Sequence, residues 1–530
     1  MGCLDSSQKT VLIVCLLLII TFTAAFGKQA VSYPPEIAQV LDSAGNNRIE
    51  LEKVLSHYAA VGDSLKLKAA NFLIANMQGH SYASFVLMDS SKNEIPFNVL
   101  DYPNLETLEK AFDTLESKHG SLDFKVTKLV RDIDTIRADF LIKQVDYAFR
   151  AWREKPWAKK LSFDDFCNYV LPYRGSNEPL EDWREYFWEK YKDIQSRISD
   201  STGPVAAARL INDDIMSWFT FNDRYYYHPT DQSLSEMLQN KMGRCEDMTN
   251  ITIYAMRANG LAVTSDYTPA WANAGGNHAW NSILISGAKV IPFMGAERAP
   301  GDYSLQYKPA KVYRKMFSEQ KNNLVFQPRK QPKIPGWLAG KNYIDVTSDY
   351  VPVQHTTVTF EKEVPDSVDI AYLCVFNSGE WRPVAWARIE NDHAIKSAFF
   401  TYIGTGVVCL PAFYLNEKVV PCLPPLVLLG GYEQREFRPA ESLTVSMSLV
   451  ATNPPKENEP IPGSIQLVPG LEYELFYWSD GWQSAGKNTA GTEPLVFDNV
   501  PSGCLYWLVT AGSDKEERIF SYDNGKQVWW

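Results

Sequence analysis

Residues 243–297 decide the fold, and they read GRCEDMTNITIYAMRANG (243–260), LAVTSDYTPAWANAGGNHAWNSILIS (261–286) and GAKVIPFMGAE (287–297). Apolar residues recur at helical spacing from 246 to 259, and Gly260 follows where a C-terminal cap is expected. Alternating residues at 261–268 and 279–285, then a tight turn into 289–293, predict one strand followed by a two-stranded hairpin. The pattern predicts a helix that starts at Cys245 and a strand that carries His278 back towards it.

A cysteine at a helix start and a histidine nearby can form a nucleophile and base pair. Unsatisfied N–H groups and the helix dipole lower the thiol pKa there, although Glu246 and Asp247 partly oppose the effect. His278 could remove the thiol proton and later protonate a leaving amine, while the N–H of Cys245 could stabilise an oxyanion. These residues predict a thiol enzyme.

Length, composition and charge indicate a globular protein of several domains and argue against some binding functions. The 530 residues predict roughly three to four domains, and 45% hydrophobic with 22% charged residues is typical of a globular protein. A formal net charge of −11 argues against a nucleic-acid partner. The seven histidines include no pair at metal-ligand spacing, so we expect neither a metal nor another cofactor.

The N-terminus predicts export. Residues 11–25, VLIVCLLLIITFTAA, form an apolar run, and small residues at Ala25 and Gly27 suit cleavage of a signal peptide, 1–27, before Lys28. The run is short for a spanning helix, so cleavage is favoured over a retained anchor, which would tether the protein to a membrane. We therefore expect an exported protein that is periplasmic, cell-surface or secreted.

Six cysteines remain after that cleavage, without CxxC spacing. Cys409 and Cys422 flank a predicted turn and could pair, but buried free thiols are the favoured interpretation.

The remaining sequence predicts an α+β chain with several modules. Residues 28–200 are mainly of helical periodicity, the core spans 201–345, a β-sandwich module follows at 346–450, and a second small β module occupies 451–530. The arginine and aromatic residues of 163–191 could form a plain domain interface or line a cleft.

The central stretch resembles the transglutaminase-like superfamily, whose fold is papain-like. Gly243-x-Cys245, the Asn259-Gly260 helix end and His278-Ala279-Trp280 match its pattern of a catalytic cysteine at a helix start and a histidine in an H-x-W strand. The segments NRIELEKVLSHY, FCNYVLPYR, FYWSDGW and DNGKQVWW are similar to those of exported Bacteroidetes proteins of this type. The resemblance implies that Cys245 and His278 are catalytic.

The resemblance also implies an acid just beyond the next strand, and here the sequence departs from it. Where many members have Phe-Asp-Pro, this chain has Met294 after Phe293. Glu297 is the candidate third catalytic residue and Asp302 the reserve, because either could bond the far ring nitrogen of His278 and hold its tautomer.

These observations leave two classes of function open. The first is an exported thiol enzyme that cleaves amide bonds of a peptide, protein or glycopeptide through an acyl-enzyme on Cys245, with hydrolysis favoured over transfer to an amine. The second is a catalytically silent glycan- or peptide-binding protein on the same scaffold, which Met294 and the trailing β modules motivate.

Overall fold

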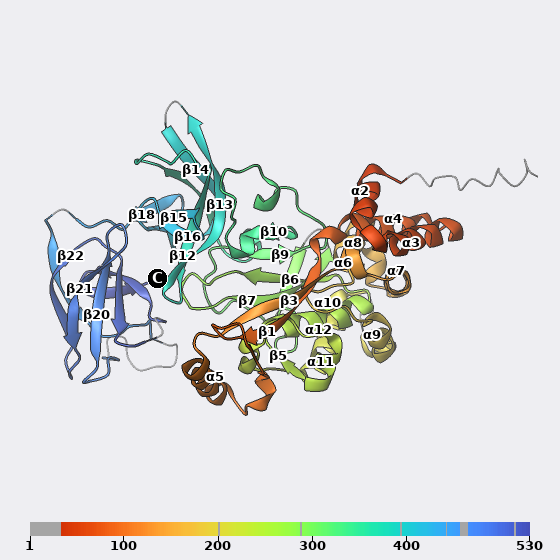
Figure 1. Cartoon of the computed structure of the whole chain (residues 1–530), viewed down its shortest axis with the longest axis horizontal. Helices are drawn as coiled ribbons and strands as arrows, with labels where there is room; N and C mark the ends of the chain where they lie inside the picture. The colour runs from red at the N-terminus through yellow and green to blue at the C-terminus, as the bar shows by residue number, and fades with distance from the viewer. Residues whose placement is uncertain are drawn as a thin grey trace, which may run out of the picture.

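The computed structural model describes residues 33–199, 202–286, 289–392, 395–440, 442–455, 465–513 and 516–530. The predicted signal peptide and the segment 456–464 lie outside these residues. The architecture is α+β as predicted: helices gather at the N-terminal end, a mixed layer of helices and strands follows, and antiparallel sheets form the other end (Figure 1). Among the described residues, no helix combines the length and apolar character needed to span a bilayer.

The N-terminal helices pack around a core of their own, which includes Leu51, Leu73, Leu141 and Phe149. Their bounds are α2 (Pro35–Ser43), α3 (Arg48–Val61), α4 (Ser64–Ala75), α6 (Asp132–Thr135), α7 (Ala138–Glu154) and α8 (Phe163–Tyr169). A further helix, α5 (Leu105–His119), lies apart from them (Figure 1) and packs through Leu108 against Val99 and Tyr225.

A three-stranded sheet interrupts these helices, in the order β2-β1-β3, and the sequence had not predicted it. Its strands are β1 (Ser81–Met88), β2 (Glu94–Ile95) and β3 (Asp123–Arg131). Almost every residue of β3 is exposed or half-buried, so the strand lacks the apolar face by which alternation is recognised.

The central layer places α12 (Cys245–Ala258) against a five-stranded sheet of order β10-β9-β6-β7-β8. Its strands are β6 (Val263–Thr268), β7 (His278–Ser286), β8 (Lys289–Phe293), β9 (Tyr313–Lys315) and β10 (Tyr343–Asp345). The flanking elements are α9 (Arg184–Lys190), α10 (Pro204–Met216), α11 (Leu234–Asn240), β4 (Thr220–Phe221) and β5 (Met242–Gly243). The helix and strands predicted from 243–297 are thereby confirmed. Every residue of α12 is buried except Glu246.

Two glycines allow the backbone to approach both ends of this layer. A Cβ at Gly243 would lie 2.5 Å from the Cβ of Asp247, and one at Gly295 would lie 2.3 Å from the hydroxyl of Thr252. Gly295 also donates its N–H to Asn281 of β7, which fixes the chain after β8 against α12. The glycines of the motifs GRC and MGA are therefore needed for close packing, in addition to marking the sequence around the site.

The next region is an eight-stranded antiparallel sheet of order β11-β14-β13-β12-β15-β17-β18, with β16 paired to β15. Side chains of β11 bond β18, through Gln354 to the carbonyl of Glu433 and Thr356 to Gln434, so the sheet curls until its two ends meet. Its strands are β11 (Val353–Thr359), β12 (Ile370–Asn377), β13 (Glu380–Asp392), β14 (Ile395–Gly404), β15 (Val407–Leu415), β16 (Lys418–Pro421), β17 (Leu426–Gly430) and β18 (Glu433–Glu436).

The last module packs a strand pair, β19-β22, with a sheet of order β21-β20-β23-β24-β25 around a shared core. Its strands are β19 (Thr444–Leu449), β20 (Glu472–Trp478), β21 (Trp482–Thr489), β22 (Leu495–Pro501), β23 (Tyr506–Thr510), β24 (Ile519–Asp523) and β25 (Lys526–Trp529). All six cysteines of the described residues are free, so Cys409 and Cys422 are not paired.

Candidate active site

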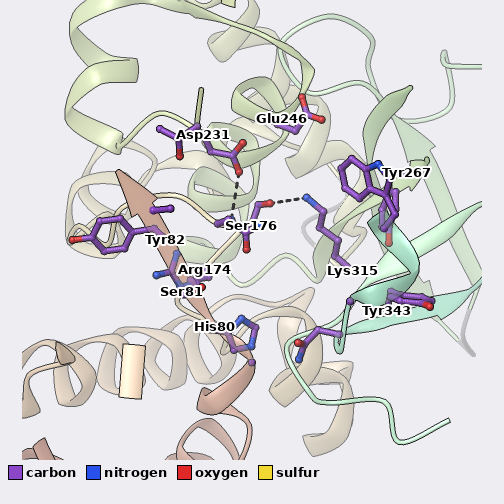
Figure 2. A pocket seen from close by; sticks show the side chains of 18 of the residues that line it. His80, Ser81, Tyr82, Arg174, Ser176, Asp231, Glu246, Tyr267, Lys315 and Tyr343 are labelled. Carbon is purple, nitrogen blue, oxygen red and sulfur yellow. Dashed lines mark hydrogen bonds between the residues drawn. The ribbon is translucent and has the colours of Figure 1, made fainter. Parts of the chain in front are cut away.

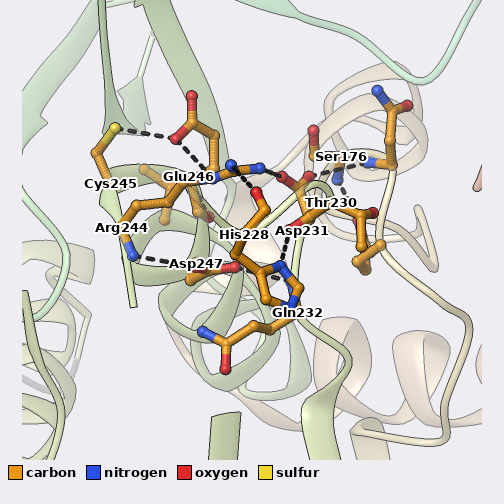
Figure 3. A network of polar contacts seen from close by, with 12 residues as sticks. Ser176, His228, Thr230, Asp231, Gln232, Arg244, Cys245, Glu246 and Asp247 are labelled. Atoms are coloured by element: carbon orange, nitrogen blue, oxygen red, sulfur yellow. Dashed lines mark hydrogen bonds and ion pairs between the residues drawn. The ribbon is translucent and has the colours of Figure 1, made fainter. Parts of the chain in front are cut away.

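Cys245 is the first residue of α12, as predicted. Asp247 fixes this start, because its carboxylate accepts the N–H of Arg244 at 3.0 Å and that of Gln232 at 2.8 Å. Burial outweighs these bonds and raises the pKa of Asp247 to about 7. Asp247 therefore caps the helix and turns away from the thiol (Figure 3).

The thiol lies in a buried position beside an acid. Its Sγ–H donates to Oε2 of Glu246 at 3.0 Å, and the residue is only 4% exposed (Figure 3). Burial raises the pKa of Cys245 well above its usual value, and the charge and hydrogen bond of Glu246 raise it further. The backbone of Ala279 and the charge of Arg244 act in the opposite direction. In this state the sulfur holds its proton.

His278 begins β7, where it pairs with Thr268 of β6. The ring lies among aromatic side chains, with centroid distances of 5.8 Å to Trp280, 6.1 Å to Trp271 and 6.4 Å to Tyr303. Burial lowers the pKa of His278, and the negative charge of Glu246 partly opposes this. The imidazole is therefore favoured in its neutral form, which is the form a general base requires.

The side chains of Cys245 and His278 lie close to each other but form no hydrogen bond. The sulfur interacts with the backbone of Ala279, which directly follows His278 in the chain. Both side chains also lie close enough to Glu246 and Tyr303 for their charges or rings to interact. Glu246 thus stands near the nucleophile and the imidazole together.

The backbone before His278 is held by residues from the β modules. The side chain of Asn377 donates to the carbonyls of Trp271, Ala274 and Gly276, and its Oδ1 accepts the N–H of Gly276 at 3.1 Å. From the last module, Arg518 donates to the carbonyl of Ala272 at 2.7 Å. The turn that positions the imidazole is therefore fixed by two downstream sheets.

Neither predicted third acid bonds His278 in the structure. Glu297 is exposed, and its side chain makes no hydrogen bond or ion pair with a described residue, although its charge raises the pKa of Tyr303. Asp302 forms an ion pair with Arg209 at 2.8 Å. Met294 is buried at 1% exposure, where the related pattern has an acid. The catalytic role of Glu297 therefore remains a prediction from sequence alone.

Sequence reasoning treated Glu246 only as an unfavourable charge and missed its direct bond to the thiol. The signal was its position next to Cys245, but the direction of a side chain in the first turn of a helix is set by its neighbours. Here Arg244 lies 3.5 Å from the Glu246 carboxylate and holds it on the thiol side.

A cavity of about 900 Å³ opens beside this site (Figure 2). Glu246 and Asn277 line it, and they are the chain neighbours of Cys245 and His278. The opposite walls come from β1, the loop around Arg174, β9 and the segment 336–343. The loop within 163–191 thus contributes to a cleft.

Over the described part of the chain, no three His, Cys, Asp or Glu side chains gather in a way that could hold a metal ion.

Comparison with known proteins identifies the central layer. Residues 192–293 match the family model of the transglutaminase-like superfamily, and this segment contains both Cys245 and His278. Glu297 and Asp302 lie beyond it. No curated protein matches the chain. The resemblance inferred from GRC and HAW is confirmed, and the chain contains a transglutaminase-like domain at these residues.

Proposed function

We propose that this protein, whose residues 192–293 form a transglutaminase-like domain, is an exported thiol enzyme that acts on amide bonds through an acyl-enzyme on Cys245. The observation that carries the proposal is the placement of the sulfur at the start of α12, against the backbone of β7 directly after His278. A thiol and a neutral imidazole delivered by one helix start and one strand start suit nucleophilic catalysis.

The reaction begins with transfer of the thiol proton to His278 as substrate enters. The thiolate attacks the amide carbon, and the backbone N–H of Cys245, one of the amides left unpaired at a helix start, faces the developing oxyanion. The C–N bond breaks, His278 gives its proton to the leaving amine, and an S-acyl thioester remains on Cys245.

Water then attacks the thioester with His278 as base and releases a carboxylic acid and the thiol. Transfer to an amine follows the same route with a different acceptor, and it is the second outcome that the site chemistry allows. Competing N-acetyl-lysine against water and measuring the ratio of amide to acid products by mass spectrometry separates the two.

A different class of function, a silent binding protein, is favoured by two observations: the Cys245 thiol donates its proton to Glu246, and no described acid bonds His278. The cavity would then serve binding alone.

The deciding experiment is acylation by an N-acetyl amino-acid p-nitrophenyl ester. For an enzyme we expect a burst of p-nitrophenol with a thioester adduct on Cys245, and a rate about 10²-fold to 10⁴-fold lower in His278→Ala, because a positioned base is lost. Cys504→Ala, which removes a buried thiol of the last module, is the matched control and should acylate normally. Equal labelling of all six thiols, or no effect of His278→Ala, would favour the silent protein.

A further inference from the structure

The cavity beside the site has more positive than negative side chains on its lining, in a protein whose formal net charge is −11. The acids are Asp231 and Glu246, and the cations are Arg174, Arg244, Arg257, Lys315 and Lys341. This local excess runs against the charge of the whole chain. It indicates a cavity built for an anionic group.

Most of these cations are already engaged by the protein. Arg174 forms a buried ion pair with Asp132 at 2.5 Å, and Arg244 pairs with Asp231 at 3.0 Å. Arg257 is buried and donates to backbone carbonyls, including that of Val263 at 2.9 Å. Lys341 lies 3.7 Å from Glu319.

Lys315 is the exception. It ends β9, and its Nζ extends into the cavity to donate to Oγ of Ser176 at 2.7 Å (Figure 2). It forms no ion pair with any residue that the structure describes, and its Nζ lies 5.9 Å from the centroid of the Tyr267 ring. An ammonium has three donors, so two N–H groups remain for a ligand.

The walls around Lys315 are aromatic. Tyr267 and Trp337 line the cavity with ring centroids 5.2 Å apart, and Tyr82 and Tyr343 line it as well (Figure 2). Such faces accept the apolar parts of an extended chain while their polar tips stay available for hydrogen bonds. The volume of about 900 Å³ falls in the range of specific ligand sites.

We propose that the cavity binds a carboxylate-bearing peptide segment, with the carboxylate on Lys315 and the chain running past Glu246 towards Cys245. The part that places the scissile amide at Cys245 rests on the proposed function. The carboxylate can be a peptide C-terminus or an acidic side chain, since both present the same group to the ammonium.

Binding is tested in the Cys245→Ala variant, so that no turnover interferes, by titration calorimetry with three peptides. The probes are N-acetyl-tetraalanine with a free carboxylate, the same peptide as its amide, and N-acetyl-Ala-Ala-Glu-Ala-amide. We expect at least one carboxylate peptide to bind about tenfold more tightly than the neutral amide, the effect of one charge-assisted hydrogen bond. Which of the two binds identifies the source of the carboxylate.

Lys315→Met should abolish this preference, and Lys315→Arg should retain most of it. The matched control is Lys289→Met, an exposed lysine on β8 of the same sheet, which should leave the preference unchanged. Equal affinity for the neutral amide, a preference that survives Lys315→Met, or no binding of any probe would overturn the proposal. If Lys315→Met does not fold, the proposal is tested by comparing the affinities of the three peptides for the Cys245→Ala variant.

Failure of this inference and failure of the proposed function are separable. A carboxylate preference without acylation of Cys245 in the wild-type protein would refute the proposed enzyme and support the carboxylate site in the cavity. Acylation of Cys245 without any carboxylate preference would support the enzyme and refute the carboxylate site.

Discussion

Replacing Glu246 by glutamine tests directly what holds the proton on Cys245. The Glu246 oxygen lies 3.0 Å from the sulfur, and two unit charges at this distance repel by about 5 kcal/mol at an effective dielectric constant of about 20. The Glu246 side chain is 14% exposed, so solvent screens this repulsion towards the value of about 1.4 kcal/mol that bulk water gives. We therefore expect the glutamine variant to lower the thiol pKa by about one to two units.

The assay is the pH dependence of the reaction of Cys245 with a small disulfide reagent, followed by peptide mass spectrometry. A lower pKa gives more thiolate, but nucleophilicity falls with pKa, so each unit yields a net gain of about threefold to fourfold. At pH 7.5 Glu246→Gln should therefore react about three to ten times faster than the wild type. The matched control is Glu189→Gln, which removes an exposed carboxylate that pairs with Lys192.

The pH profile separates electrostatics from access. A lower thiol pKa makes the rate of the variant level off at a lower pH than that of the wild type. If both rates level off at the same pH and differ by a constant factor, the substitution has only opened the site. An unchanged or higher thiol pKa in Glu246→Gln would refute the assignment of Glu246 as the group that retains the proton.

Two further substitutions test the scaffold of the site. Tyr350→Phe removes the hydroxyl that accepts the Trp280 N–H at 3.0 Å and donates to Asp266 at 2.6 Å, so urea unfolding should show a loss of about 1–3 kcal/mol, and no loss would contradict these bonds. Asp247→Asn tests linkage: the folded pKa of about 7 lies above the unfolded value of about 4, so the folded state binds the extra proton. The stability of the wild type relative to this variant should fall as pH rises from about 4 to 7 and then stay level, and a rise over that window would refute the raised pKa.

Local signals explain what the sequence could predict. The start of α12 at Cys245, its end before Gly260 and the strands β6, β7 and β8 all follow from periodicity, caps and turns within one stretch. Each of these signals acts between residues close in the chain.

The features that the sequence could not predict depend on contacts between side chains that are distant in the chain. Apolar residues keep helical spacing through 133–152, yet the chain breaks at Ile136, because Glu50 accepts the N–H of Ala138 and Asn47 donates to the carbonyl of Ile136. Lys315 likewise meets Ser176 from 139 positions away. Partners so far apart leave no local periodicity or motif to recognise.

The bonds from Asn377 and Arg518 to the turn before His278 bear on how this domain can be moved between proteins. A fragment cut to the matched residues 192–293 would retain the cysteine and the histidine but lose every one of these contacts. The unit that evolution or an engineer can transplant intact is therefore larger than the unit that a sequence match outlines. The two downstream sheets belong to this larger unit because they hold the turn before His278 in place, even though no catalytic residue is assigned to them.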